Sequence, residues 1–261
     1  MYHPGGVLSP RRKAGELDRK PPYERLASEN LRKRGLLPEE SVLRRVYAQY
    51  YGSVSFVDHN VGRILKAPDE EGLASNTVVV FTTDHGELVG DHWLRLKGPW
   101  MYDLVTHVPL IWRWPGRFRA GSAPEEFIEQ VDLLPTILEL AGAPAHPAAQ
   151  GRSLRPLLEG SGAPRWREAV YTGDRDSSEL PAHGIDDRGL VLKCIRTRDW
   201  KLTFFPGRPY GELFDLRHDP WEYDNLWDDP ARRNIRQELF ARLLHLYAAT
   251  EDPLPERVAP N

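Results

Sequence analysis

The chain has 261 residues, with 35 Lys and Arg against 38 Asp and Glu, so its formal net charge is −3. This near balance argues against a strongly basic nucleic-acid-binding protein and against a polyacidic tail. No apolar run reaches the roughly 18 residues of a membrane span, and the first residues lack the pattern of a signal peptide. The single cysteine, Cys194, excludes an internal disulfide and a cysteine-rich metal site.

The first 37 residues combine Pro and Gly with clustered Arg and Lys and have no sustained period, so we expect an irregular, extended segment. A helix is predicted to follow, with Pro38 at its first position and its end at Ala67 and Pro68. Apolar side chains recur along it at steps of three and four, at Val42, Val46, Tyr50, Val54, Val57, Val61 and Ile64. Such a stripe is typical of a helix that packs one face against a core.

The next segment, 77–83, is β-branched and apolar on both faces, which predicts a central parallel strand covered by helices on both sides. A second apolar run at 108–112 predicts another strand. Residues 131–142 predict a short helix that Gly142 closes. This order of helices and strands is typical of an α/β fold.

Short strands separated by tight turns are predicted at 191–195, 200–205 and 212–216, which favours an antiparallel sheet. A final helix at 231–249 would cover that sheet. We therefore divide the chain into a core at 1–160 and a C-terminal subdomain at 161–261.

The densest polar cluster, 84–98, begins where the predicted buried strand ends, and ligands of open α/β sheets bind outside the carboxyl ends of strands. Asp84 offers a hard oxygen and His85 a neutral imidazole, both suitable metal ligands. Gly86 would let the backbone turn sharply. Lys97 is a compact cation suited to an anionic oxygen of a sulfate or phosphate.

Plainer interpretations exist for each of these residues. An Asp-His pair after a strand can be ordinary loop chemistry, Asp91 and His92 can make turn hydrogen bonds, and Glu87 can be solvated or cap a short helix. Two ligands also do not complete a site, because Ca²⁺ takes about six or more oxygens and Zn²⁺ about four ligands.

The sequence F-T-T-D-H-G-E-L-V-G-D-H at 81–92, with K-G-P at 97–99 and V-P-L-I at 108–111, closely resembles the second half of the sulfatase family, in the alkaline phosphatase superfamily. The similarity extends over essentially the whole chain, through 53–65, 131–136, 151–154 and 212–226. It implies a partial alkaline-phosphatase-like α/β core with a parallel or mixed sheet, followed by a small C-terminal subdomain of antiparallel sheet plus helix.

The resemblance also implies roles for residues of the polar cluster. Asp84 and His85 would be two ligands of a Ca²⁺ ion, with Mg²⁺, Mn²⁺ and Zn²⁺ as alternatives, and Lys97 would contact the sulfate of the substrate. The nucleophile of such enzymes is a formylglycine made from Cys or Ser in a C-x-P-S-R type motif. Its hydrated form attacks sulfur while the metal and basic residues hold the anionic oxygens.

This chain lacks that motif and the other family residues that precede the matched region. Cys194 stands in C-I-R-T-R, where Arg196 replaces the required Pro, and it lies in a predicted strand, so we interpret it as a packed small side chain. The opening residues resemble an internal segment of the family. Our hypothesis is that the chain corresponds to the C-terminal half only of a sulfatase, truncated or completed by a separately encoded N-terminal half, and inactive alone.

The predicted function is therefore hydrolysis of sulfate esters, of a small molecule or a sulfated glycan. Two alternatives stay open: a metal-dependent phosphate mono- or diester hydrolase of the same superfamily, and a non-catalytic remnant or subunit. Nucleic-acid binding is not expected, because acidic residues are interspersed with the Arg and Lys clusters in a pattern typical of a solvated face. We expect no membrane partner. The compartment stays open, since relatives are cytoplasmic or exported.

Overall fold

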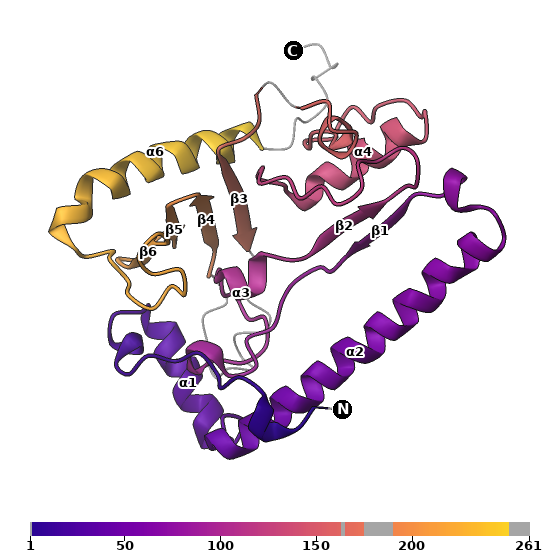
Figure 1. The fold of residues 1–261 in the computed structure, drawn as a ribbon. Helices are drawn as coiled ribbons and strands as arrows, with labels where there is room; N and C mark the ends of the chain where they lie inside the picture. Colours follow the sequence, from indigo (N-terminus) through magenta and orange to yellow (C-terminus); the bar gives the residue numbers. More distant parts are fainter. Residues whose placement is uncertain (1, 163–164, 175–189, 251–261) are drawn as a thin grey trace, which may run out of the picture.

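The computed structural model describes residues 2–162, 165–174 and 190–250 (Figure 1). It is an α/β structure with a two-stranded sheet, β1-β2, and a four-stranded antiparallel sheet in the order β3-β4-β5-β6. Helices α1 to α4 belong to the first part of the chain and α6 lies along the four-stranded sheet. The predicted class, a partial α/β core followed by an antiparallel sheet plus helix, is confirmed.

Helix α1 spans Pro22–Lys33, where we expected an irregular segment, so that prediction was wrong. The helix begins with Pro22 in its first turn, where the missing N–H costs no hydrogen bond. Tyr23, Ala27 and Leu31 recur every four residues and are buried. This short apolar stripe among many charges was the signal that the sequence reasoning overlooked.

Helix α2 spans Glu40–Glu70, so it begins two residues after Pro38 and continues beyond Pro68 for two more residues. Its N-terminal part is anchored by the buried Leu43, Tyr47 and Ala48. Further along, the helix runs along one side of the molecule away from the C-terminal sheet (Figure 1). None of the described helices is both long and apolar enough to cross a bilayer.

Strand β1, Val79–Thr82, pairs with β2, Leu110–Arg113, in an antiparallel register that places Val79 opposite Arg113 and Thr82 opposite Leu110. The two strands are confirmed, but the expected parallel pairing and full burial are not found among the described residues. All four residues of β1 are half-buried. The described part of the chain puts no strand on the other edge of β1, so the backbone groups along that edge have no strand partner there.

The C-terminal sheet contains β3 (Ala169–Asp174), β4 (Leu192–Thr197), β5 (Trp200–Phe204) and β6 (Gly211–Asp215). The last three match the predicted strands, and β3 was missed. Helix α6, Arg233–Ala249, confirms the predicted final helix. Its buried residues pack on one face of the sheet in a cluster that contains Leu239, Leu243, Ile195, Leu202 and Leu213.

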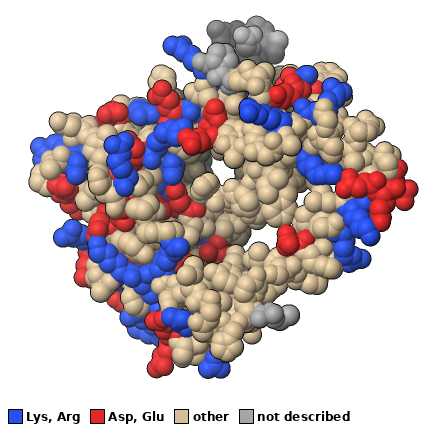
Figure 2. All heavy atoms as spheres, in the orientation of Figure 1, with Lys and Arg blue, Asp and Glu red and all other residues tan. Residues whose placement is uncertain are grey.

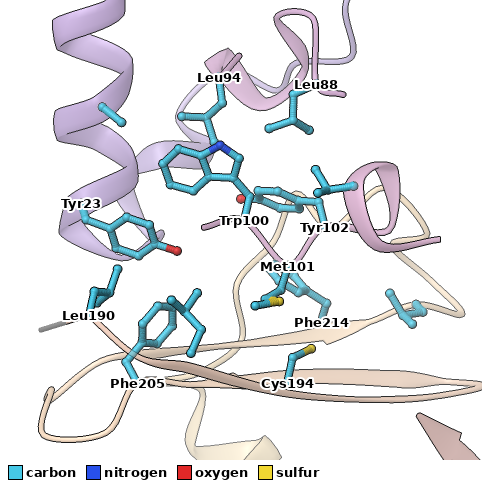
Figure 3. Packing of buried hydrophobic residues seen from close by; sticks show 14 residues of the cluster. Tyr23, Leu88, Leu94, Trp100, Met101, Tyr102, Leu190, Cys194, Phe205 and Phe214 are labelled. Carbon is cyan, nitrogen blue, oxygen red and sulfur yellow. The ribbon is translucent and has the colours of Figure 1, made fainter. Parts of the chain in front are cut away.

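The opposite face of that sheet packs against the first part of the chain (Figure 3). Tyr23 of α1 stacks on Trp100 with ring centroids 5.3 Å apart and also contacts Phe205, while Cys194 and Phe214 come from β4 and β6. One hydrophobic core therefore contains residues of both predicted parts, 1–160 and 161–261. The domain boundary near residue 160 stays a prediction.

Shorter helices lie between these elements: α3 (Asp103–Thr106), α4 (Leu133–Leu140) and α5 (Arg155–Leu158), with a 3₁₀ turn, Gln130–Asp132, directly before α4. The predicted helix at 131–142 is thus confirmed in α4. Its end has Gly142 at φ +68°, in the left-handed region that favours glycine.

Large apolar side chains are exposed along α2 and on neighbouring elements, although their spacing predicts a buried face. Phe56 is 69% exposed and Ile64 is 65% exposed. Few charged side chains cover the middle of α2 (Figure 2). Further exposed apolar residues are Val54 and Val57 of α2, Ile111 of β2, and Leu134 and Ile137 of α4. We call this set the open apolar face.

Because exposed apolar patches favour association, we predict that the 261-residue chain self-associates at micromolar concentration and above. Replacing both Val57 and Ile64 by Lys should lower light scattering without lowering the free energy of unfolding, since neither side chain is buried. The matched control is Leu244→Lys on α6, also exposed, which should change scattering little. Equal scattering by the double variant and the parent chain would contradict the prediction.

A buried pair links the N-terminal segment to the loop after β1. His92 Nδ1 lies 3.3 Å from a Glu16 carboxylate oxygen, and both side chains are almost fully buried. Burial raises the pKa of Glu16 to about 7, although Lys20 opposes the shift, and burial lowers the pKa of His92 to about 3. Between about pH 3 and pH 7 the pair is therefore a neutral acid hydrogen-bonded to a neutral imidazole.

The raised pKa makes the contribution of Glu16 to stability pH-dependent. Protonated Glu16 is favoured in the folded chain, so its contribution is complete below pH 4.5, the ordinary value, and is lost as the pH rises to about 7. Glu16→Gln keeps a hydrogen-bond donor and cannot ionise. In urea unfolding, the free energy of unfolding of the variant should rise relative to that of the parent chain as the pH increases from 4.5 to about 7. Above about pH 7 the difference between the two free energies should stay constant. A pH-independent difference would contradict this assignment.

Candidate metal and anion site

Asp84 and His85 directly follow β1, as the sequence predicts. The Asp84 side chain is 83% exposed. Its Oδ1 accepts hydrogen bonds from the His85 backbone N–H at 2.9 Å and from the Thr83 hydroxyl at 3.2 Å. The His85 N–H, followed by the neighbouring imidazole, lowers the pKa of Asp84, so the carboxylate is ionised at neutral pH, as a metal ligand must be.

The imidazole of His85 is oriented by its own backbone neighbourhood. Its Nδ1 lies 2.8 Å from the carbonyl oxygen of Gly86. Because a carbonyl only accepts, Nδ1 carries the proton and Nε2 keeps its lone pair. That Nε2 lies 3.6 Å from Oδ2 of Asp84, a separation that two ligands of one cation can have at bond lengths of about 2.0–2.6 Å.

The donor set is incomplete for a protein metal site. The described residues contain no group of three or more His, Cys, Asp or Glu that could hold a metal ion. A structural or catalytic Zn²⁺ has at least about three protein ligands, and Ca²⁺ has about six to eight oxygens. Asp84 and His85 therefore fit part of a coordination sphere.

Lys97 lines the same cavity as Asp84 and His85, so the structure brings all three predicted site residues to one hollow. The cavity has a volume of about 1240 Å³. Its walls come from the loop after β1, the α3 region, residues 124–131 and strands β3 and β4. The face shown in Figure 2 is hollowed between the C-terminal sheet and the β1-β2 ribbon. The roles of the three residues stay predictions.

Gln130 holds the carboxyl end of β1 in place and was not among the predicted residues. Its side-chain amide donates to the carbonyl oxygen of Thr83 at 2.8 Å and to that of Asp84 at 3.4 Å. The preceding Glu129 accepts the backbone N–H of Tyr171 at 2.8 Å. This segment thus connects the Asp84 turn to strand β3, and the sequence offered only its position before a predicted helix as a signal.

Gly86 is required by a close approach of two backbones. Its N–H donates to the carbonyl oxygen of Val105 at 2.8 Å, and a Cβ at this position would lie 2.0 Å from the carbonyl oxygen of Leu104. We expected a glycine here because the backbone would turn sharply, but Gly86 is not in the left-handed region. The structure gives another reason for the glycine, which is its close contact with the α3 segment.

The remaining acids of the cluster stabilise the loop. Glu87 accepts the backbone N–H groups of Val89 at 3.0 Å and Leu96 at 2.6 Å, and so ties the two ends of the 87–96 segment together. Asp91 is buried and accepts the Tyr47 hydroxyl at 2.9 Å and the backbone N–H of Arg11. These are long-range contacts with α2 and the N-terminal segment, where we expected turn hydrogen bonds.

A buried ion cluster supports the wall of the cavity on the C-terminal sheet. Lys201 Nζ lies 2.8 Å from Asp103 and 2.8 Å from Glu222, and Arg196 lies 3.0 Å from Asp103. Burial alone would raise the pKa of Asp103, but Lys201 and Arg196 outweigh it and lower the pKa to about 2. The cluster is balanced in charge and fixes α3 against β4 and β5.

Cys194 is buried in the core beneath this wall. Burial raises the pKa of its thiol to about 12, so the thiolate that a nucleophile requires is not formed at neutral pH. The interpretation of Cys194 as a packed side chain agrees with this environment.

Two family models match the chain: the sulfatase model over residues 12–143, and the model of N-sulphoglucosamine sulphohydrolase, C-terminal, over residues 90–249. The chain is 34% identical over 209 residues to the multifunctional alkaline phosphatase superfamily protein PehA of Trinickia caryophylli, covering 76% of this chain and 39% of PehA. It is 32% identical over 232 residues to N-acetylglucosamine-6-O-sulfatase of Bacteroides thetaiotaomicron, covering 86% of this chain and 40% of that protein.

Among solved structures, the phosphonate monoester hydrolase SpPMH from Silicibacter pomeroyi superposes with a TM-score of 0.87 at 29% identity, over 97% of this chain and 52% of that chain. The fold and the matches define a domain of the alkaline phosphatase superfamily. The chain belongs to the sulfatase family. It spans about 40% of the length of the two curated relatives and about half of the solved structure.

The close approach at Gly86 generates a prediction. Gly86→Ala must displace the α3 backbone, because the new methyl group would collide with the carbonyl oxygen of Leu104. We expect a loss of about 2 kcal/mol or more in the free energy of unfolding. Gly116→Ala, at a turn with open space, is the control for adding a methyl to glycine, although its φ of +77° adds a strain of its own. A smaller loss at Gly86 than at Gly116 would contradict the close-approach argument.

Proposed function

We propose that this chain supplies the metal- and sulfate-binding part of a sulfate-ester hydrolase. The observation that carries the proposal is that Asp84, His85 and Lys97 line one cavity at the carboxyl end of β1. A carboxylate and an imidazole beside a lysine suit a cation and an anion held next to each other. Family membership supports the same chemistry.

In this proposal Asp84 and His85 hold a divalent cation, Ca²⁺ in the first instance, with Mg²⁺, Mn²⁺ or Zn²⁺ as alternatives. When bound, the cation supplies a positive charge that stabilises the anionic oxygens of the reacting ester. Asp84 contributes an ionised carboxylate, and His85 contributes Nε2 because Nδ1 is committed to Gly86. Lys97 places an ammonium group against a sulfate oxygen and neutralises part of its charge.

The nucleophile of this reaction is not among the described candidates, since the C-x-P-S-R motif does not occur in the 261 residues. We propose that a further polypeptide segment brings a formylglycine and the missing metal ligands to the cavity. The open apolar face and the edge of β1 that has no strand beside it among the described residues support this, because both fit the addition of an apolar α/β layer.

The substrate that we propose is a sulfated small molecule or a sulfated glycan. A phosphonate or phosphate monoester is the second candidate, and the superposition with a phosphonate monoester hydrolase is the observation that favours it. Both substrate types present tetrahedral anionic oxygens, which one cation and one lysine can hold equally well.

The chain alone should bind Ca²⁺ weakly, with a Kd of about 1 mM or above, because two protein ligands are too few for a tighter site. Calorimetry on the chain and on Asp84→Asn tests this, with Asp58→Asn on α2 as the matched control. The chain alone should also not hydrolyse an aryl sulfate. Rapid turnover by the purified chain, or tight stoichiometric Ca²⁺ binding, would contradict the incomplete site.

The class of ester that is hydrolysed is tested on the native protein, purified together with the further polypeptide segment that we propose. Parallel assays with aryl sulfate, aryl phosphate and phenylphosphonate esters should give the highest kcat/KM on the sulfate, and Lys97→Met should lower that value by about 100-fold or more. A higher kcat/KM on the phosphonate ester than on the sulfate ester would contradict the proposal and favour the second candidate function.

A further inference from the structure

A second cavity of about 510 Å³ adjoins the first and has no part in the proposed chemistry. It lies between α6, the turn that joins β4 to β5, and the segment that leads into β3. Glu126, Phe127 and Arg198 line both cavities. A ligand whose reacting group is near Lys97 could therefore extend directly into the second cavity.

The walls of this second cavity are rich in aromatic rings, with Trp166, Trp200 and Phe127 among the lining residues. The indole N–H of Trp166 donates to the carbonyl oxygen of Phe127 at 2.6 Å, which fixes the orientation of the ring. A fixed, half-buried indole offers a flat apolar surface beside polar groups. This combination suits the apolar face of a sugar ring, whose edge carries hydroxyl groups.

The charges of the second cavity show no positive excess. Its basic residues are Arg167, Arg198 and Arg242, and its acidic residues are Glu126, Glu168, Asp199 and Glu238. Several are already paired: Arg198 with Glu125 at 3.2 Å, Arg242 with Glu238 at 3.8 Å, and Asp199 with Arg217 at 2.7 Å. Carboxylates beside guanidinium groups can bind neutral hydroxyls by donating and accepting hydrogen bonds, whereas a second sulfate would need surplus positive charge.

We propose that the second cavity binds an uncharged sugar residue that is joined to the sulfated residue in the first cavity. This inference rests on the proposed function for the position of the sulfate, and it specifies the substrate as an oligosaccharide. Arg198 lies at the junction of the cavities. Its ion pair with Glu125 is solvent-exposed on both sides and so contributes little, which leaves the guanidinium able to turn toward the linking sugar.

The test is calorimetric titration of the 261-residue chain, at low concentration, with three probes. These are N-acetylglucosamine 6-sulfate, the disaccharide in which that sugar is joined to one N-acetylglucosamine, and unsulfated chitobiose. The sulfated disaccharide should bind about tenfold more tightly than the sulfated monosaccharide, the size expected for one added aromatic contact.

Two variants address the second cavity directly. Trp166→Leu should abolish the tenfold advantage of the disaccharide, and Glu168→Gln, an exposed position that cannot unfold the chain, should reduce it about threefold. Trp221→Leu is the matched control, because Trp221 is partly exposed and lines neither cavity. The inference would be overturned if the parent chain bound the sulfated disaccharide no more tightly than the monosaccharide. It would also be overturned if both variants kept the tighter binding of the disaccharide.

The probes separate this inference from the proposed function. If the monosaccharide sulfate binds and the disaccharide binds no better, the second cavity is not a sugar site, while the proposed function stands. If no sulfated sugar is preferred and chitobiose still binds in a Trp166-dependent way, the sugar site stands and the sulfate chemistry fails. Absence of binding by all three probes would overturn the sugar site, while the proposed function, which needs the further segment, is tested by the ester assays above.

Discussion

The geometry of the site depends on how the backbone is held where β1 ends. Gln130 binds the carbonyl groups of Thr83 and Asp84, and Gly86 lies against the α3 segment too closely for any other residue. These contacts turn the chain out of the sheet so that the Asp84 carboxylate and the His85 imidazole lie 3.6 Å apart on the wall of a cavity that also contains Lys97. Without them, the same three residues would be ordinary loop residues.

The second constraint is that β1 and α2 leave exposed or half-buried several apolar side chains that their sequence patterns predict to be buried. The apolar pattern of β1 is that of a strand covered on both faces, yet β1 has one antiparallel neighbour among the described residues and half-buried side chains. The stripe on α2 has the spacing of a core-facing helix and yet exposes Val54, Val57 and Ile64. The open apolar face and the two candidate cation ligands both fit our proposal of a complementary layer that supplies strands and further ligands together.

Much of the fold could be predicted because local patterns determined it. The strands after residue 190 are short apolar runs separated by turn residues, and helix α6 is a run rich in Leu, Arg and Ala. The candidates Asp84, His85 and Lys97 follow from their place after an apolar strand. Other features depend on distant contacts. Helix α1 is stabilised by burial of Tyr23 and Ala27 under Trp100 and the C-terminal sheet. Gln130 and Asp91 form hydrogen bonds with residues 47 and 80 positions away in the sequence.

The central claim is that Asp84 and His85 bind a divalent cation beside Lys97. The most direct measurement is paramagnetic line broadening of the backbone amide signals of the 261-residue chain as Mn²⁺ is added. The account predicts that the signals of residues 83–86 and 97–98 broaden first and that Asp84→Asn removes this broadening. Broadening centred on another part of the chain, or broadening of residues 83–86 that persists in Asp84→Asn, would contradict it.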